Sequence, residues 1–298
     1  MTSPGLLVVD KPTGTTSHDV VGRVRRILGT RKVGHAGTLD PMATGVLVIG
    51  VDRATRLLGH LALTDKAYAA TIRLGVSTVT DDADGPVVST APPQAVQALE
   101  QSELVQVLAG LTGTVRQRPS AVSAVKVDGR RAYDLVRSGE DVELPERTVT
   151  ISSIETDEVR RLTGAVDLDI RVECSSGTYI RAIARDLGER LGVGGHLTRL
   201  RRTRVGPFTA EEAVTLDKLA EAPQAALIPM PVVARRCFPV WEVDTPTAHV
   251  VTNGVRVPWA TVPAGAGPVA MVDPGGRFLA LAEDDGGRAR YLVVFPES

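Results

Sequence analysis

RKVGHAGTLDPMATGVL, residues 31–47, is the stretch from which the rest of the chain is best interpreted. Three glycines and one proline surround one histidine, His35, and one aspartate, Asp40. Glycine permits backbone conformations that other residues avoid, and Pro41 restricts the turn after Asp40. The apolar run VLVIGV at 46–51 predicts a buried strand. A carboxylate in a tight turn beside such a strand is suited to act as a nucleophile. An Asp-Pro pair is also typical of a helix start, with Asp40 as the N-cap.

Further motifs follow or precede this stretch in a definite order. They are DKPTGTTSHDVVGRVRRILGTRKVG at 10–34, KAYAATIRLG at 66–75, SSGTYIRAIARDLG at 175–188 and HLTRLRRTRVGPF at 196–208. Together with GHAGTLDP at 34–41, they resemble the pseudouridine synthases, specifically the bacterial tRNA pseudouridine-55 synthases of the TruB type. The resemblance covers roughly the first three quarters of the chain.

The resemblance implies a set of site residues with Asp40 as the catalytic nucleophile. It implies that His35 takes part in flipping the target uridine, that Tyr68 stacks on the flipped uracil and that Tyr179 touches the base. It also implies that Arg181 pairs with Asp40, which would keep a partly desolvated carboxylate ionised. Two further residues are implied near the substrate, namely Leu200 and Lys11.

Each of these residues also has an ordinary structural interpretation. Tyr68 alone would be a half-buried tyrosine on a strand, and Leu200 alone would be a core leucine. Lys11 would be an exposed lysine in a loop. TYIR at a helix start would supply capping and surface charge. Only the resemblance favours the functional interpretation of these positions.

The charge of the chain is uneven although its net value is only −1. Residues 1–35 carry six Lys or Arg and two acids, and Arg23 and Arg26 point away from the apolar stripe of the helix predicted there. A second cluster has no acid within eight residues and consists of Arg199, Arg201, Arg202 and Arg204. A basic cluster is often just a solvated face. Two clusters flanking a candidate site favour contacts to an RNA backbone.

Periodicity and turn residues predict the order of elements. A strand is expected at 6–10, a helix with Ser17 as its N-cap and Gly29 as its C-terminal cap, one helix over 92–109 and a strand at 168–174. A linker is expected at 221–231, and short β-rich runs beyond it (249–251, 269–272, 278–282 and 291–295) predict a small β-barrel.

The resemblance implies the fold class and the domains. The expected fold is α+β, with a central mixed, mainly antiparallel sheet flanked by helices. A catalytic domain is expected at 1–228, and a small RNA-binding domain of the PUA kind at 232–298. Within the first, an insertion at about 116–147 is expected to close over RNA and to order only when RNA binds.

The implied reaction isomerises uridine 55 in the T-loop of tRNA to pseudouridine after the base is flipped out, with no cofactor and no metal. The T-arm of tRNA is the expected partner, without a membrane or an obligate protein partner, so a monomer in the cytoplasm is predicted. All apolar runs are far shorter than the ~20 residues that span a bilayer. Two alternatives remain open at this point: an RNA-binding or tRNA-folding protein with secondary catalysis, and a guide-RNA-dependent pseudouridine synthase.

Overall fold

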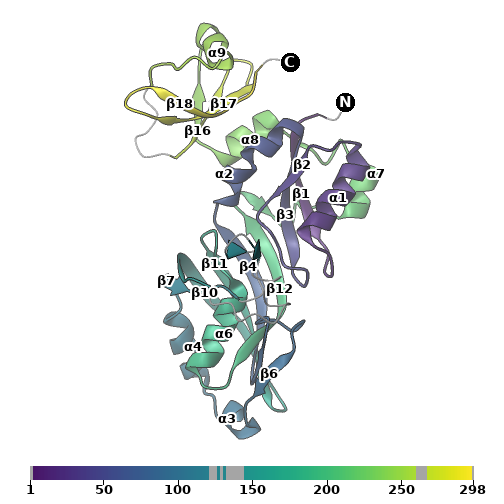
Figure 1. Cartoon of the computed structure of the whole chain (residues 1–298), viewed down its shortest axis with the longest axis vertical. Helices are drawn as coiled ribbons and strands as arrows, with labels where there is room; N and C mark the ends of the chain where they lie inside the picture. The colour runs from purple at the N-terminus through teal and green to yellow at the C-terminus, as the bar shows by residue number, and fades with distance from the viewer. Residues whose placement is uncertain (1–2, 121–125, 128–129, 132–143, 260–266, 297–298) are drawn as a thin grey trace. The chain divides into compact units, whose positions relative to one another are not determined.

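A computed structural model describes residues 3–120, 126–127, 130–131, 144–259 and 267–296 (Figure 1). The chain divides into two compact units. The first comprises Met1–Pro41, Gly45–Ala62 and Gly206–Ser298, and the second comprises Met42–Thr44 and Leu63–Val205. The insertion expected at 116–147 lies mostly outside the described residues, and the domain boundary expected near residue 230 stays a prediction. Among the described helices, none combines the length and the apolarity needed to cross a bilayer.

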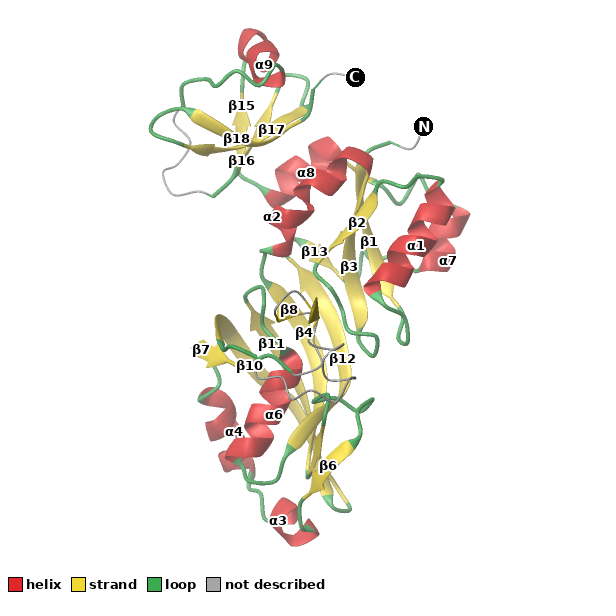
Figure 2. Cartoon of the chain, viewed as in Figure 1, coloured by secondary structure: helices red, strands yellow, loops and turns green. Residues whose placement is uncertain are grey.

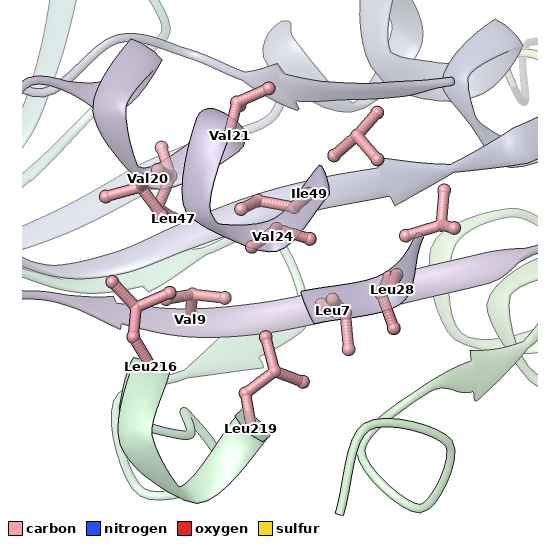
Figure 3. Close-up of a cluster of buried hydrophobic side chains, with 12 residues drawn as sticks. Leu7, Val9, Val20, Val21, Val24, Leu28, Leu47, Ile49, Leu216 and Leu219 are labelled. Atoms are coloured by element: carbon pink, nitrogen blue, oxygen red, sulfur yellow. The ribbon is translucent and has the colours of Figure 1, made fainter. Parts of the chain in front are cut away.

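The first unit holds the strands that lead into and out of the residue 31–47 stretch. β1 (Gly5–Lys11) and β2 (Val33–Ala36) both pair antiparallel with β3 (Thr44–Val51), and β14 (Ile228–Pro229) pairs with β1. The helices α1 (Ser17–Leu28) and α7 (Leu216–Glu221) pack on one face of these strands (Figure 3). That core contains Leu7, Val9, Val20, Val21, Val24, Leu28, Val33, Leu47, Ile49, Val51, Leu216 and Leu219. Burial of each large aliphatic side chain contributes about 1.5–3 kcal/mol, so this face anchors the strands firmly.

The start of α1 differs from the prediction by one residue. Thr16 is the N-cap: its side chain accepts the Asp19 N–H at 3.1 Å, and Asp19 in turn accepts the Thr16 N–H at 2.9 Å. Ser17 is therefore the first helical residue, and its hydroxyl is used elsewhere. Gly29 ends the helix with φ 63°, as predicted, because glycine adopts this left-handed conformation without a Cβ clash.

The second unit is built on one antiparallel sheet with the strand order β12-β4-β11-β10-β7. These strands are β4 (Lys66–Leu74), β7 (Gly113–Gln117), β10 (Arg147–Leu162), β11 (Ala165–Cys174) and β12 (Gly195–Val205). The helix α6 (Ile180–Arg190) packs against β4 and β12 (Figure 2). Gly195 makes this approach possible, because a Cβ there would lie 2.5 Å from the Ala184 carbonyl oxygen of α6.

The helix predicted over 92–109 is two helices, α3 (Pro93–Gln97) and α4 (Gln101–Ala109). Glu100 has extended backbone at the start of α4, which interrupts the helix although the apolar spacing continues through it. The remaining short elements are η1 (Asp52–Leu57), α2 (Leu58–Ala62), β5 (Val76–Thr78), β6 (Val87–Thr90), β8 (Lys126–Val127), β9 (Arg130–Arg131) and β13 (Phe208–Thr209).

The last sixty residues form a small sheet of four strands, in the order β15-β16-β17-β18, with α9 (Thr245–Thr252) packed on it. The strands are β15 (Val240–Glu242), β16 (Val269–Val272), β17 (Phe278–Asp284) and β18 (Ala289–Val294), and β15 pairs with β16 in parallel. The predicted strand at 249–251 is wrong, since these residues lie in α9. The predicted linker at 221–231 is also wrong, since it contains β14 and the first residues of α8 (Met230–Cys237). An α+β fold with mainly antiparallel sheets is confirmed.

Candidate active site

Asp40 lies in the loop between β2 and β3, where the main chain is held on both sides of it. The Leu39 N–H donates to Ser17 Oγ at 2.9 Å, and Ser17 Oγ donates to the Leu39 carbonyl at 3.2 Å. The Pro41 carbonyl accepts hydrogen bonds from the Gly14 N–H at 2.8 Å and from Lys11 Nζ at 3.2 Å. A turn at Pro41 leads directly into β3, so the alternative in which Asp40 caps a helix is wrong. The half-buried carboxylate is carried by a loop with little freedom to move.

Lys11 is hydrogen-bonded to the loop that carries Asp40. Its side chain is fully buried, and Nζ donates to the carbonyl oxygens of Pro12 (3.0 Å), Thr15 (2.7 Å) and Pro41 (3.2 Å). These three acceptors match the three N–H donors of an ammonium group. The alternative of an exposed loop lysine is therefore wrong. Lys11 holds the loop that carries Asp40, and its contact with substrate stays a prediction.

His35 reaches the same loop from β2. It pairs with Ile49 of β3 and is half-buried. Two residues later, Gly37 has φ 84° and turns the chain toward Asp40. His35 and Asp40 thus both belong to the first unit, at the end of β2 and in the loop that follows it.

Tyr68 and Leu200 project from one face of the second unit's sheet. Tyr68 on β4 lies opposite Arg202 on β12, and Leu200 lies opposite Ala70, two residues along the same face. Gly195, which contacts α6, is opposite Leu74 on this face as well, so α6 covers it. Tyr68 is 7% exposed and Leu200 is 5% exposed. Both side chains are therefore buried on the face of the sheet that α6 covers, and their contact with the base stays a prediction.

The arginine cluster of β12 is divided between the two faces of the sheet, so it does not form the single basic surface that was expected. Arg202 is 1% exposed on the Tyr68 face, and a side chain so buried offers nothing to a phosphate. Its predicted RNA contact is therefore wrong. The other members, Arg199, Arg201 and Arg204, pair with residues of the opposite face, Thr71, Ala69 and Ala67.

That opposite face carries acids as well as arginines. Arg204 lies 3.2 Å from Glu173, and Arg73 lies 2.7 Å from Asp167. Carboxylates of Asp157, Glu158 and Asp169 line the same pocket as Arg199. Because these acids compete with phosphate for the guanidinium groups, RNA contacts by Arg199, Arg201 and Arg204 stay a prediction that the geometry weakens.

Tyr179 stands at the N-cap position of α6 and is held by a residue that the sequence analysis missed. Gln117 Nε2 donates to the Tyr179 carbonyl at 3.0 Å, and Gln117 Oε1 accepts the Tyr179 N–H at 2.8 Å. Gln117 ends β7 and is 3% exposed. A carboxamide is suited to this position because it donates and accepts at once. An isolated glutamine gives no sequence signal for such a contact across 62 residues.

Arg181 is buried two residues further along. Its Nη1 donates to the Thr80 carbonyl at 2.7 Å and lies 3.4 Å from Asp82 Oδ2, with both side chains less than a tenth exposed. Asp82 was missed as well, since its acid-rich loop suggested no individual role. The predicted pairing of Arg181 with Asp40 stays a prediction.

Next to this pair, Arg185 Nη1 lies 3.2 Å from Asp81 Oδ2. Burial raises the pKa of Asp81, against the opposing effect of this guanidinium. The buried carboxylates of Asp82 and Asp81 thus orient the guanidinium groups of Arg181 and Arg185, respectively.

The two arginines predicted on α1 lie at its surface. Arg26 is exposed, and Arg23 is half-exposed with Asp217 at 3.4 Å. Of the two arginines predicted to contact the RNA backbone, Arg26 is therefore more accessible to a phosphate than Arg23, which is partly paired with Asp217.

Comparison with solved structures defines the class of protein. The chain resembles one in the crystal structure of a Cbf5-Nop10-Gar1 complex, with a TM-score of 0.74 and 28% identity, covering 98% of this chain and 85% of that one. It also resembles a chain in a structure of an H/ACA RNP bound to a substrate RNA containing 2'-deoxyuridine, with a TM-score of 0.70 and 27% identity, covering 94% and 77%. The fold is that of the pseudouridine synthases.

Family models give the narrower assignment. Residues 25–180 match the N-terminal domain of the TruB family pseudouridylate synthases, residues 181–227 match the tRNA pseudouridylate synthase B C-terminal domain, and residues 238–296 match the C terminal of tRNA pseudouridine synthase II. The chain belongs to the TruB family.

Similar curated proteins named tRNA pseudouridine synthase B come from Streptomyces avermitilis, 54% identical over 99% of this chain and 98% of that protein, and from Rhodococcus jostii, 56% identical over 97% and 93%.

Proposed function

We propose that this enzyme converts uridine 55 in the T-loop of tRNA to pseudouridine, with Asp40 as the nucleophile. The observation that carries the proposal is the clamped loop around Asp40, in a chain of a pseudouridylate synthase family. A loop whose main chain is held at Leu39 and at Pro41 presents its carboxylate in one direction. Such preorganisation removes part of the entropic cost of reaching the transition state.

The reaction is an isomerisation that balances without any other reagent. The bond between ribose C1' and N1 of uracil breaks, the base rotates, and a bond from C1' to C5 replaces it. The proton on C5 leaves, and N1 gains one. Asp40 forms a temporary covalent bond to the nucleoside, which splits one difficult step into easier ones. No oxidant or phosphoryl donor enters this balance.

The second unit supplies groups that suit the detached base. A uridine in a stacked T-loop is out of reach for an aspartate, so the nucleotide must be extruded first. We assign the stacking surface to Tyr68, which holds a flat ring while leaving its rotation free. Tyr179 contacts the base, Leu200 packs against it, and Arg181 supplies the cation that keeps the nucleophile ionised. His35 of the first unit fills the space that the extruded uridine leaves.

The choice of tRNA as substrate rests on the curated relatives, which are named tRNA pseudouridine synthase B. We further propose that the enzyme acts as a monomer in the cytoplasm and that exposed Arg26 contacts the RNA backbone.

A guide-RNA-dependent enzyme is the second candidate, because one solved relative is an H/ACA RNP with a substrate RNA. Purified protein and an unmodified tRNA transcript, with no other component, distinguish the two. Pseudouridine at position 55 supports the first candidate, and its absence until a guide RNA is added supports the second.

The nucleophile is tested with Asp40→Asn in a single-turnover assay. We expect no product, while tRNA affinity stays within a few-fold of the wild type, because the amide keeps the shape and loses only the nucleophilic charge. Glu221→Gln, which removes an exposed carboxylate of the same unit, is the matched control and should react normally. Substantial pseudouridine formed by Asp40→Asn would refute the assignment.

A further inference from the structure

Ser17 makes two hydrogen bonds to a single residue, and that residue precedes Asp40. Its hydroxyl accepts the Leu39 N–H at 2.9 Å and donates to the Leu39 carbonyl at 3.2 Å. A hydroxyl has one donor and can accept at the same time, so both of its capacities are used on this residue. Ser17 is 2% exposed and Leu39 is 4% exposed, so water does not replace these bonds easily.

The helix does not need this hydroxyl. Thr16 caps α1, with its side chain on the Asp19 N–H and the Asp19 carboxylate on the Thr16 N–H. Ser17 follows it at the first helical position, with its side chain directed to Leu39, 22 residues further along the chain. Two adjacent residues of similar chemistry thus have different tasks, and only one of them contacts the Asp40 loop.

The bond to the Leu39 carbonyl acts on the peptide group that leads into Asp40, and the bond from the Leu39 N–H acts on the peptide group before it. The Leu39 carbonyl belongs to the peptide that joins Leu39 to Asp40, so the Ser17 hydroxyl orients the plane of this peptide. On the other side, Pro41 restricts Asp40 to extended conformations by steric contact with the preceding residue. The Pro41 carbonyl is held in turn by Gly14 and Lys11. Asp40 therefore has restrained main chain both before and after it.

We propose that Ser17 is a positioning residue for the pseudouridine synthase reaction, which sets the direction of the Asp40 carboxylate through the Leu39 peptide. The proposal rests on the proposed function, in which Asp40 is the nucleophile. Without the hydroxyl, the Leu39 N–H and carbonyl lose their partners inside the protein, and this peptide can rotate. The carboxylate then spends less time in the orientation for attack. Substrate binding does not depend on this orientation.

The test compares Ser17→Ala with Thr16→Ala, two neighbouring substitutions that each remove one hydroxyl. The single-turnover rate at saturating enzyme, the tRNA affinity and the midpoint of thermal unfolding are measured for both. We expect both variants to unfold at a lower temperature. Only Ser17→Ala should react about 10- to 100-fold more slowly, the range expected for a misplacement of about 1 Å at the reacting group. Affinity for tRNA should stay within a few-fold in both. Ser17→Cys, with a thiol that is a weak donor and acceptor, should react at an intermediate rate.

Several outcomes would overturn the proposal. One is a folded Ser17→Ala protein that reacts at the wild-type rate; another is an equal loss of rate in Thr16→Ala. If Ser17→Ala does not fold, a wild-type rate for Ser17→Cys overturns it as well. Asp40→Asn is assayed alongside. Activity in Asp40→Asn would refute the proposed function, whereas an inactive Asp40→Asn with a fully active Ser17→Ala refutes only the positioning role.

Discussion

Replacement of Gln117 tests whether the start of α6 must be held for the reaction to proceed. In the wild type, the Gln117 carboxamide pairs with both main-chain groups of Tyr179. Gln117→Met removes both hydrogen bonds while keeping the length of the side chain. Gln117→Glu keeps the oxygen that accepts the Tyr179 N–H and places a second oxygen against the Tyr179 carbonyl. The first substitution therefore removes both hydrogen bonds, and the second removes only the bond to the Tyr179 carbonyl.

The expected magnitude follows from the geometry. A buried main-chain group left without a hydrogen-bond partner costs about 1–3 kcal/mol, and Gln117→Met leaves two such groups, the N–H and the carbonyl of Tyr179. Tyr179 is half-buried, so water can replace part of the lost hydrogen bonding. We therefore expect the free energy of unfolding to fall by about 2 kcal/mol, near the lower end of the summed range. Gln117→Glu should lose a similar amount at neutral pH, because its buried charge faces a carbonyl oxygen.

The effect on the reaction should exceed the effect on folding. With Tyr179 released, the single-turnover rate of Gln117→Met should fall about 10- to 100-fold at saturating enzyme. Thr112→Ala is the control, since it precedes the same strand and loses the hydrogen bond from Oγ1 to the Leu108 carbonyl at 3.2 Å. Urea unfolding gives the stability of each variant. If Gln117→Met is less stable but reacts as fast as Thr112→Ala, Gln117 is a structural residue only and the reasoning fails.

Two further predictions concern buried and exposed cations. Burial, and then the nearby Arg202 guanidinium, lower the pKa of Lys66 to about 8 from 10.5, so between these pH values the unfolded chain binds more protons. The contribution of Lys66 to stability should therefore rise with pH from about 8 to 10.5, and Lys66→Met should lack this contribution when its urea unfolding is compared with that of the wild type across that range. On the surface, Arg26→Ala should reduce the salt dependence of tRNA binding by roughly 0.7–0.9 in the log–log slope. Arg204→Ala should change the slope less than Arg26→Ala does, because Arg204 lies 3.2 Å from Glu173; an equal change in both variants would contradict this view.

Local patterns were sufficient to predict much of the amino-terminal half. The apolar runs of β1 and β3 and the spacing of Val20, Val21 and Val24 predict buried faces, and the structure confirms them. Gly29 could be assigned because a left-handed cap strongly favours glycine. The N-cap of α1 was predicted one residue too late, at Ser17, since Thr16 and Ser17 are both good caps and only the contact with Leu39 separates them.

Site residues that act through other residues could not be found from local patterns. Asp40 was singled out because its own turn is unusual in composition. Gln117 and Asp82 act on residues 62 and about a hundred positions away, and nothing in their own neighbourhood indicates a partner. For Lys11 the local sequence was misleading. The turn that follows it suggests an exposed side chain, but the ammonium group is buried and donates to three carbonyl oxygens.

The arginines of β12 show why a basic run in a strand is hard to interpret. Strict alternation would place Arg202 and Arg204 on one face, opposite to Arg199 and Arg201. β12 has β-bulges between Leu197 and Arg199 and between Arg202 and Arg204. Each bulge inserts one extra residue into β12, so the alternation of side chains between the two faces shifts by one residue at that point. The second bulge returns Arg204 to the face of Arg201, so Arg202 alone among the four remains beside Tyr68. A count of charges in the sequence cannot reveal this, because it depends on where β12 carries an extra residue relative to β4. The density of arginines in a strand is therefore weak evidence for a phosphate-binding surface until the register of that strand is known.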